Sequence, residues 1–175
     1  MESLATAILG QTGPMLAYAE GLLKDVTPET FARKPMGKDG AIDTNHPAFV
    51  FGHLATYPAK ICQLAGIENA GIEAPAGYTE LFDAGKDCQD DTDGTIYPPM
   101  GEITAAFFDS YKAAIDKIGG LRNDHLAAGH GMDSEFGEKF GSRAAIVGFM
   151  LGAHPFMHIG QISAWRRCMG LGPVF

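Results

Sequence analysis

No Asp, Glu, Lys or Arg occurs in the segment from Ala144 to Trp165, and this gap in the charge pattern restricts what the chain can fold into. An uncharged segment of this length is long enough to span a bilayer. It also contains two His, a Gln, a Ser, a Pro and three Gly, and such polar groups are costly in hydrocarbon. We therefore predict a helix that is buried on most sides in a protein core, and no membrane partner.

Apolar residues follow helical spacing in four segments, at about residues 3–26, 45–66, 101–118 and 142–169, whereas the alternation typical of strands is weak throughout. The apolar faces of the first three segments are Met15, Ala19, Leu22 and Val26; Val50, Leu54, Ile61 and Leu64; and Ile103, Phe107, Ser110, Ala114 and Ile118. The sequence has 175 residues, 46% of them hydrophobic, and no internal repeat. It predicts a single all-α domain over residues 1–175.

Proline, glycine and capping residues mark the ends of these helices. Pro14 is expected to kink the first helix or to separate its first turns. The second helix is expected to begin near Asn45 as N-cap, with Pro47 in its first turn, and to stop at Gly66. The third helix is expected to end at the glycine pair 119–120, and the fourth before Gly170.

The connection between the second and third helices runs from about Ile67 to Met100 and is rich in Gly, Pro and Asp. It is far longer than usual for neighbouring helices, so the two helices need not be antiparallel. Its acidic part, residues 87–94, suggests a calcium loop, but an EF-hand register puts Gln89 at the first ligand position and Met100 at the last. We therefore predict a solvated acidic loop.

Charge and cysteine content exclude several classes of function. The net charge is −8 and no Lys/Arg-rich run occurs, so we expect no nucleic-acid partner. The first residues carry Glu2 where a secretory signal carries basic residues, which predicts a cytoplasmic protein. Cys62, Cys88 and Cys168 are scattered and odd in number, which predicts reduced thiols rather than disulfides or a thiolate metal site.

His154 and His158 are four residues apart in the fourth predicted helix, so they project from one face and can reach the same metal ion. The same face carries Val147, Leu151, Gln161 and Trp165. Two histidines at this spacing are more often incidental than a metal site. His53 strengthens the metal interpretation because it lies among apolar residues in the middle of another predicted helix. Gly52 beside it can admit a second helix at close range.

Pro155 distinguishes this segment from the zinc-protease motif, in which a Glu directly after the first His acts as general base. Proline cannot do this. It also lacks an N–H, so we expect the helix to bend at the site.

Other polar residues have weaker claims to a functional role. His46 shares the face of His53 but lies two turns away, about 10 Å along the axis, so a pocket or capping role is expected rather than metal ligation. Gln161 either lines the cavity or satisfies backbone groups, and Trp165 joins His46 and Gln161 as a candidate substrate-binding residue. His125, His130, Arg33 and Lys34 are expected at the surface, and the last two could also receive an anionic substrate.

Three stretches of the chain resemble the DinB/YfiT-like superfamily of metalloenzymes: Gly52-His53-Leu54-Ala55, His154-x-x-x-His158-x-x-Gln161-Ile162, and the ending from Trp165 to Pro173. The resemblance covers nearly the whole chain. It implies a DinB-like four-helix bundle of up-down-down-up topology with a long connection between helices 2 and 3. It also implies a divalent metal, often zinc or nickel, bound by His53, His154 and His158, and frequently a homodimer. Pro155 departs from the superfamily pattern, where an acidic or small residue is usual.

Some members of this superfamily are thiol S-transferases or isomerases that use low-molecular-weight thiols such as mycothiol or bacillithiol, and many have no known activity. Three nitrogen ligands leave a coordination position open, where a metal lowers the pKa of a bound water or thiol. The resemblance therefore implies a metal-dependent transferase acting on a small-molecule substrate. The alternatives are a metal-dependent hydrolase and a non-catalytic, stress-related protein that binds a metal or ligand.

The other side of the fourth helix is also apolar and partly small. It carries Phe149, Gly152, Phe156, Ile159 and Gly160. Both sides therefore require burial, which predicts the core on one side and a neighbouring helix or a second subunit on the other.

Overall fold

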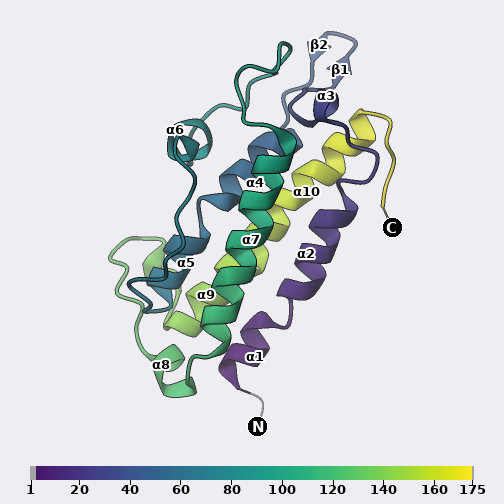
Figure 1. Ribbon diagram of the computed structural model, residues 1–175. Coiled ribbons are helices and arrows are strands. Elements are labelled where there is room, and N and C mark those ends of the chain that lie inside the picture. Colours follow the sequence, from purple (N-terminus) through teal and green to yellow (C-terminus); the bar gives the residue numbers. More distant parts are fainter. Residues whose placement is uncertain (1–2, 175) are drawn as a thin grey trace.

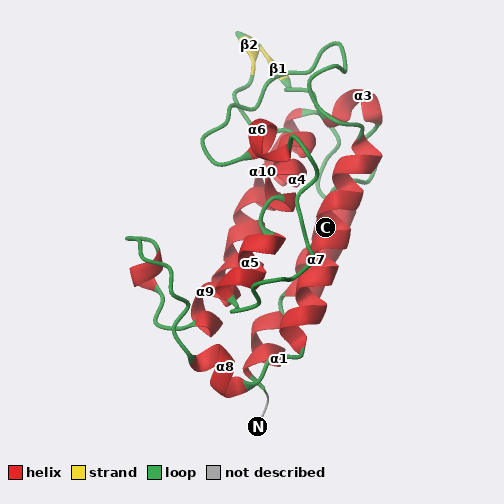
Figure 2. Ribbon diagram, turned by 60° about the vertical axis from the view of Figure 1, so that its left-hand side comes forward, coloured by secondary structure: helices red, strands yellow, loops and turns green. Residues whose placement is uncertain are grey.

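The structure is a computed structural model that describes residues 3–174. Most of its secondary structure is helical (Figures 1 and 2). Helix accounts for 55% and strand for 2%, which confirms the all-α class. The helices are α1 (Leu4–Leu9), α2 (Thr12–Gly21), α3 (Pro28–Phe31), α4 (Pro47–Ala55), α5 (Pro58–Leu64), α6 (Tyr78–Phe82), α7 (Met100–Gly119), α8 (Asn123–Ala127), the 3-10 helix η1 (Gly137–Lys139), α9 (Arg143–Leu151) and α10 (Ala153–Cys168). A short antiparallel hairpin, β1 (Met36–Gly37) and β2 (Gly40–Ala41), was not predicted.

The first predicted helix is divided into α1 and α2. Ser3 caps α1 by accepting a hydrogen bond from the Thr6 backbone N–H. Pro14 lies in the first turn of α2, where a helix has no N–H bond to lose, so the separation falls before the proline. The helix stops at Gly21 rather than near residue 26, and Asp25 in the following turn has a positive φ of 62°.

The prediction of one helix over residues 45–66 is wrong in two respects. The helix is interrupted between α4 and α5, because Pro58 has no backbone N–H to donate to a carbonyl of the preceding turn. The N-cap is His46, whose Nδ1 accepts from the Phe49 N–H at 3.2 Å, whereas the Asn45 side chain donates to Gln161. Pro47 occupies the first turn as predicted.

The fourth predicted helix consists of α9 and α10. Ser142 caps α9 by accepting from the Ala145 N–H. The break falls at Gly152, with φ −122° and ψ −85°, so Pro155 lies in the first turn of α10 and removes no helical hydrogen bond. The expected bend is therefore present, but it lies at Gly152, three residues before Pro155.

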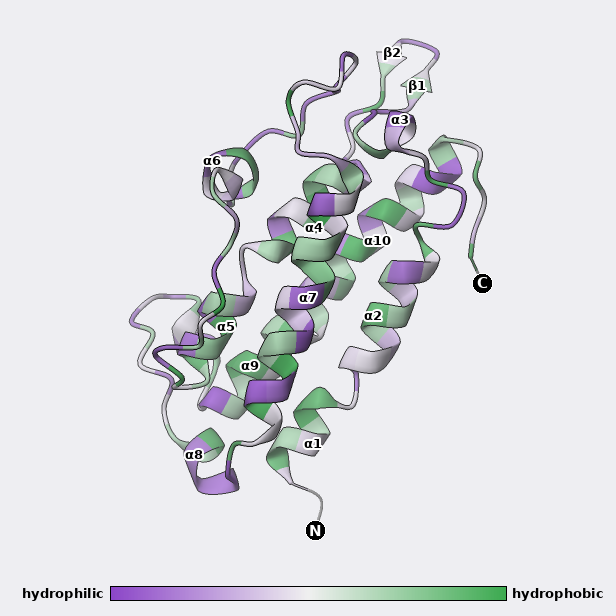
Figure 3. Cartoon of the chain, in the orientation of Figure 1, coloured by the Kyte–Doolittle hydropathy of each residue, from purple (hydrophilic) through white to green (hydrophobic). Residues whose placement is uncertain are grey.

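Helix α7 is unbroken and lies at the centre of the helical packing, against α1, α4 and α5 (Figure 1). Every residue of α4 is buried, because α4 lies between α7, α6 and α10. Ile103, Phe107, Ala114 and Ile118 of α7 are buried as predicted, but the fifth buried position is Tyr111 rather than the predicted Ser110, whose hydroxyl donates to the Ala106 carbonyl. Figure 3 shows the hydrophobic residues that these helices contribute, which are especially frequent in α9.

The second face of α9 and α10 is covered in part by the chain itself. Ile159 and Gly152 are buried, and Phe149 packs against Phe140 with ring centroids 5.3 Å apart. Gly160 is exposed. The segment Arg143–Cys168 is long and apolar enough to cross a membrane by length and composition, and half of its most apolar window is buried inside the structure. Core helices meet the same criterion.

The connection between α5 and α7 carries α6 and is less solvated than predicted. Asp91 is only 5% exposed, and its carboxylate accepts hydrogen bonds from three backbone N–H groups, at residues 95, 96 and 97. Asp90 forms an ion pair with Arg33 at 2.8 Å, and Lys34 forms one with Asp43 at 3.0 Å. Asp91 fixes a turn of the connection and Asp90 binds Arg33, because the connection folds back on the segment after α3.

Candidate metal centre

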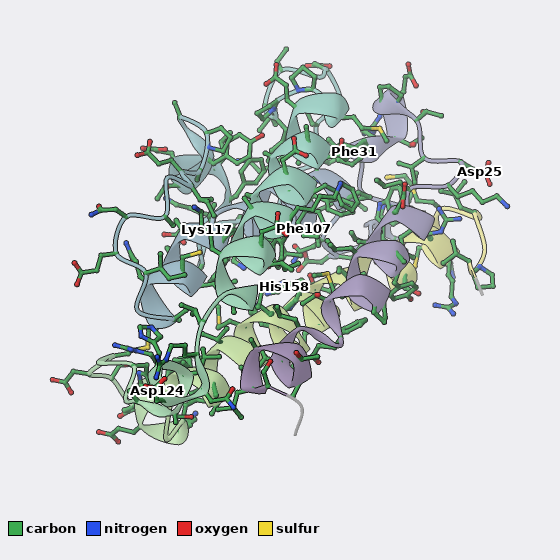
Figure 4. The ribbon with its side chains drawn as sticks, turned by 60° about the horizontal axis from the view of Figure 1, so that its bottom comes forward. Asp25, Phe31, Phe107, Lys117, Asp124 and His158 are labelled. Atoms are coloured by element: carbon green, nitrogen blue, oxygen red, sulfur yellow. The ribbon has the colours of Figure 1, made fainter. Side chains whose placement is uncertain are left out.

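Helices α4 and α10 bring three histidines together inside the protein. His53 comes from α4, and His154 and His158 come from α10. Their ring centroids are 4.5 Å apart for His53 and His158, 4.8 Å for His154 and His158, and 6.0 Å for His53 and His154. One nitrogen from each ring lies within 4.8 Å of the other two, so the group can hold a single metal ion. Figure 4 shows His158 between the helices, away from the end of the molecule marked by Asp124.

The local sequence explains why His154 and His158 lie together, and helix packing explains why His53 joins them. The i, i+4 spacing places His154 and His158 on one face of α10, one turn apart. Because α10 restarts after Gly152, His154 lies in its first turn. His53 reaches them only because α4 packs against α10.

Burial keeps the three imidazoles neutral. Desolvation, assisted by the neighbouring rings of His158 and His53, lowers the pKa of His154 to about 3. Desolvation and the His53 ring lower the pKa of His158 to about 4. Burial also lowers the pKa of His53, against a backbone hydrogen bond that acts to raise it. A metal ion at neutral pH therefore competes with no proton at these nitrogens.

The Phe82 carbonyl orients His53. The Nδ1 of His53 donates to this oxygen at 2.7 Å, which leaves the Nε2 lone pair for a ligand. Phe82 is buried against Gly52, where an added Cβ would lie 2.5–2.6 Å from the Phe82 ring. Gly52 was expected to admit another helix at close range, and what it admits is the Phe82 ring of the short helix α6.

The donor atoms fit a divalent metal with an open coordination position. The Nδ1 of His154 is buried without a hydrogen-bond partner among the described residues, and a metal ion coordinated by this nitrogen would satisfy its lone pair. Imidazole nitrogen suits zinc, nickel, copper and iron. Metal–nitrogen bonds of ~2.0–2.1 Å put tetrahedral ligand atoms roughly 3.3 Å apart. The present separations of at most 4.8 Å would have to shorten by up to about 1.5 Å when a metal binds.

A pocket of about 330 Å³ opens onto the three histidines. Besides these ligands it is lined by Asn45, Phe49, Tyr57, Asp83, Ala84, Gly85 and Lys86. The Tyr57 ring lies 5.0 Å from that of His53 and 4.5 Å from that of His154, between centroids. We did not select Tyr57 from the sequence, although its position four residues after His53 puts it on the same helical face. Burial raises the pKa of its hydroxyl, which favours the neutral phenol as a hydrogen-bonding group.

The candidate substrate-binding residues have different environments. Gln161 is half-buried and accepts from the Asn45 amide at 3.0 Å, and its side chain acts to raise the pKa of His158 against the effect of burial. Trp165 is fully buried, and its Nε1 donates to the Arg33 carbonyl at 2.7 Å. His46 uses both ring nitrogens for backbone groups, since its Nε2 donates to the Gln89 carbonyl at 2.8 Å while its Nδ1 caps α4. None of the three, Gln161, Trp165 or His46, lines the pocket over the three histidines.

The two histidines expected at the surface are half-buried and hold loops. The Nε2 of His125 lies 2.7 Å from the Ala65 carbonyl and that of His130 lies 2.9 Å from the Phe140 carbonyl, each acting as the donor. The sequence prediction of solvated side chains is wrong for both, because the segment between α7 and α9 folds against the helices.

His46 makes stability depend on pH. Desolvation lowers its pKa to about 4 in the folded protein, so between this value and ~6.5 the unfolded chain binds the extra proton. The stabilisation is complete above pH 6.5 and is lost as the pH falls towards 4. His46→Asn keeps a capping side chain but no titrating imidazole. Between pH 7 and pH 4.5, we expect the free energy of unfolding of this variant to fall by about 1–3 kcal/mol less than that of the unmodified protein, both treated with chelator. Denaturant titrations at the two pH values measure these free energies, and equal losses in the two proteins would contradict the role of His46.

Comparison with known proteins assigns no family to the chain. No protein-family model matches it, and no curated protein matches it. What the site can do is therefore argued from its residues, which provide three neutral nitrogens, an oriented imidazole and an adjoining pocket.

Proposed function

We propose that the protein is a divalent-metal-dependent transferase that uses a low-molecular-weight thiol and a small-molecule substrate. The observation that carries this proposal is the convergence of His53, His154 and His158, with ligand nitrogens within 4.8 Å of one another at the base of a pocket. Zinc or nickel is the proposed metal. When bound, such a metal supplies Lewis acidity, which lowers the pKa of a thiol at its open position.

The other residues of the pocket favour thiol transfer over hydrolysis. Asp83 is the sole carboxylate that lines it among the described residues. A backbone hydrogen bond from Ala84, and then Lys60, hold the pKa of Asp83 below its usual range, which makes it a weak general base. A thiol bound at the metal needs no such base. None of the pocket-lining residues is a cysteine, so the reacting sulfur is proposed to come from a small molecule.

The chain's own side chains would bind and orient the reactants. Phe49 and Tyr57 form apolar walls that exclude water from the histidines. Lys86 lines the exposed side of the pocket, where its ammonium group can attract an anionic thiol. The Phe82 carbonyl holds the His53 ring in place by accepting a hydrogen bond from its Nδ1.

We also propose that the chain belongs to the DinB/YfiT-like superfamily and forms an up-down-down-up four-helix bundle. In this proposal the bundle helices are α1–α2, α4–α5, α7 and α9–α10. The packing of α7 against α1, α4 and α5, and of α10 against α2 and α4, supports it. Homodimerisation is proposed from the same resemblance, and sedimentation equilibrium tests it.

Thiol binding can be tested with the cobalt-substituted protein. We expect a sulfur-to-cobalt charge-transfer band in the near ultraviolet when 2-mercaptoethanol is added at millimolar concentration. Ethylene glycol, which replaces sulfur by oxygen, is the matched control and should give no such band. If cobalt is bound and the thiol leaves the spectrum unchanged, the transferase proposal fails. Chelator-sensitive turnover of p-nitrophenyl acetate would then support the hydrolase alternative, and its absence would support a binding protein.

A further inference from the structure

A second cavity, of about 360 Å³, adjoins the three-histidine pocket. It shares Tyr57 and His154 with that pocket, and among the described residues Lys60 is the single charged one that lines it. The remaining lining is Leu64, Met132, Phe136, Phe149, Met150 and Met157, and these six residues are called the apolar pocket below. Any group that fills the apolar pocket therefore also meets the His154 side of the metal centre.

Three parts of the chain build the apolar pocket. Leu64 comes from α5, and Met150 and Met157 come from α9 and α10. Met132 and Phe136 come from the segment before η1, which lies beside α5 and α9 in Figure 2. An aromatic cluster holds this segment in place, with centroids 5.6 Å apart for Phe136 and Phe149. The cavity is thus formed by packed side chains of both loop and helices.

The apolar pocket offers apolar contacts, and its charged side chain is already paired. Lys60 is already engaged, because its Nζ lies 3.3 Å from an Asp83 carboxylate oxygen and 5.1 Å from the centroid of the Tyr57 ring. Met157 is 59% exposed and Met132 is 38% exposed, although both are hydrophobic. Covering such surface is favourable, and flexible, polarisable thioethers adapt to the shape of a ligand. The volume lies in the range of small-molecule sites.

We propose that the apolar pocket binds the apolar group of the substrate whose reacting atom lies at the three-histidine centre. The inference rests on the proposed function and deepens it. The substrate class is an electrophile with an aromatic ring or a short alkyl chain next to its reacting atom. A ligand group is favoured over a second copy of the chain because the cavity is concave and because it continues into the metal pocket through His154 and Tyr57.

Alkyl hydroxamates of increasing chain length test this inference on the zinc-loaded protein. The hydroxamate group binds zinc and the alkyl chain probes the apolar pocket. By calorimetry we expect affinity to rise about fourfold per methylene from acetohydroxamate to hexanohydroxamate, which corresponds to the ~0.8 kcal/mol gained on burying a methylene group. Elemental analysis at the end of each titration checks that the protein has kept its zinc.

Met157 is the most exposed residue of the apolar pocket and provides a variant that should fold. Met157→Ser is expected to reduce the dependence on chain length to twofold or less per methylene, while leaving acetohydroxamate affinity unchanged. Met36→Ser is the matched control, because Met36 is an exposed methionine of the β1–β2 hairpin that lines neither pocket. It should reproduce the dependence of the unmodified protein.

The outcomes separate this inference from the proposed function. If acetohydroxamate fails to bind the zinc-loaded protein, the open coordination position is absent and both proposals fall. If acetohydroxamate binds but chain length has no effect, only the apolar-pocket inference is overturned. It is also overturned if Met157→Ser leaves the series unchanged and instead converts a dimer to a monomer, because the face would then be an interface between copies.

Discussion

Replacing His53 or His154 by alanine is expected to lower the affinity of the protein for Zn²⁺ by roughly 100-fold or more. Outer-shell partners of metal ligands already contribute 10–100-fold, so removal of a ligand itself should have at least that effect. The unmodified protein should contain close to one zinc ion per chain. Competition with a chromophoric chelator measures the affinity, and elemental analysis measures the content.

His154→Ala should leave the stability of metal-free protein unchanged, whereas His53→Ala also removes the donor to the Phe82 carbonyl and should cost ~1–3 kcal/mol. His154 is 8% exposed and its Nδ1 has no partner in the described structure, so its removal takes away an unsatisfied polar atom. A difference common to both variants should appear when metal is added. At a free zinc concentration 1,000 times the Kd, binding stabilises the unmodified protein by about 4 kcal/mol, whereas variants with 100-fold lower affinity should gain about 1.4 kcal/mol or less.

His130→Ala is the matched control for these two variants. It also removes a half-buried imidazole, but His130 bonds the Phe140 carbonyl and lies outside the three-histidine group. It should keep one zinc ion per chain and the full thermal shift. Full zinc content in both His53→Ala and His154→Ala would falsify the metal centre, whatever the activity of the protein.

Arg166→Met is expected to reduce the free energy of unfolding by about 2–4 kcal/mol. Arg166 is only 1% exposed, and no described carboxylate pairs with it. Instead its guanidinium donates to backbone carbonyls of two segments: Leu22 and Lys24 after α2, and Leu171 and Gly172 at the C-terminal end. Methionine fills similar space but leaves these oxygens without a donor, at a cost of ~1–3 kcal/mol for a buried group.

Arg167→Met is the control, since Arg167 is the next residue and is exposed. Its guanidinium bonds only its own helix, at the Ser163 hydroxyl and carbonyl. A surface change of this kind should stay within about 0.5 kcal/mol. The Arg166 variant should melt roughly 5–15 °C lower than the unmodified protein. Equal melting temperatures of the two variants would show that the buried guanidinium does not connect the segments.

The helices could be predicted because the signals for them are local. Apolar residues at helical spacing marked the segments, and the buried stripe of α7 agrees with the prediction except that Tyr111 takes the place of Ser110. The break before Pro58 is also a local signal, and the prediction of a continuous second helix did not use it. The N-cap of α4 could not be predicted locally, because it depends on a distant residue. The Asn45 amide donates to Gln161, and His46 accepts the Phe49 N–H instead.

The sequence alone determined that His154 and His158 share a face, because the hydrogen-bond geometry of a helix fixes the direction of residues four apart. Only the tertiary structure decided that His53 joins them, that the Phe82 carbonyl orients it, and that an apolar pocket adjoins His154. These features need segments far apart in the chain to meet at defined distances. Such meetings result from many weak packing contacts distributed over the whole core, and no local pattern encodes them.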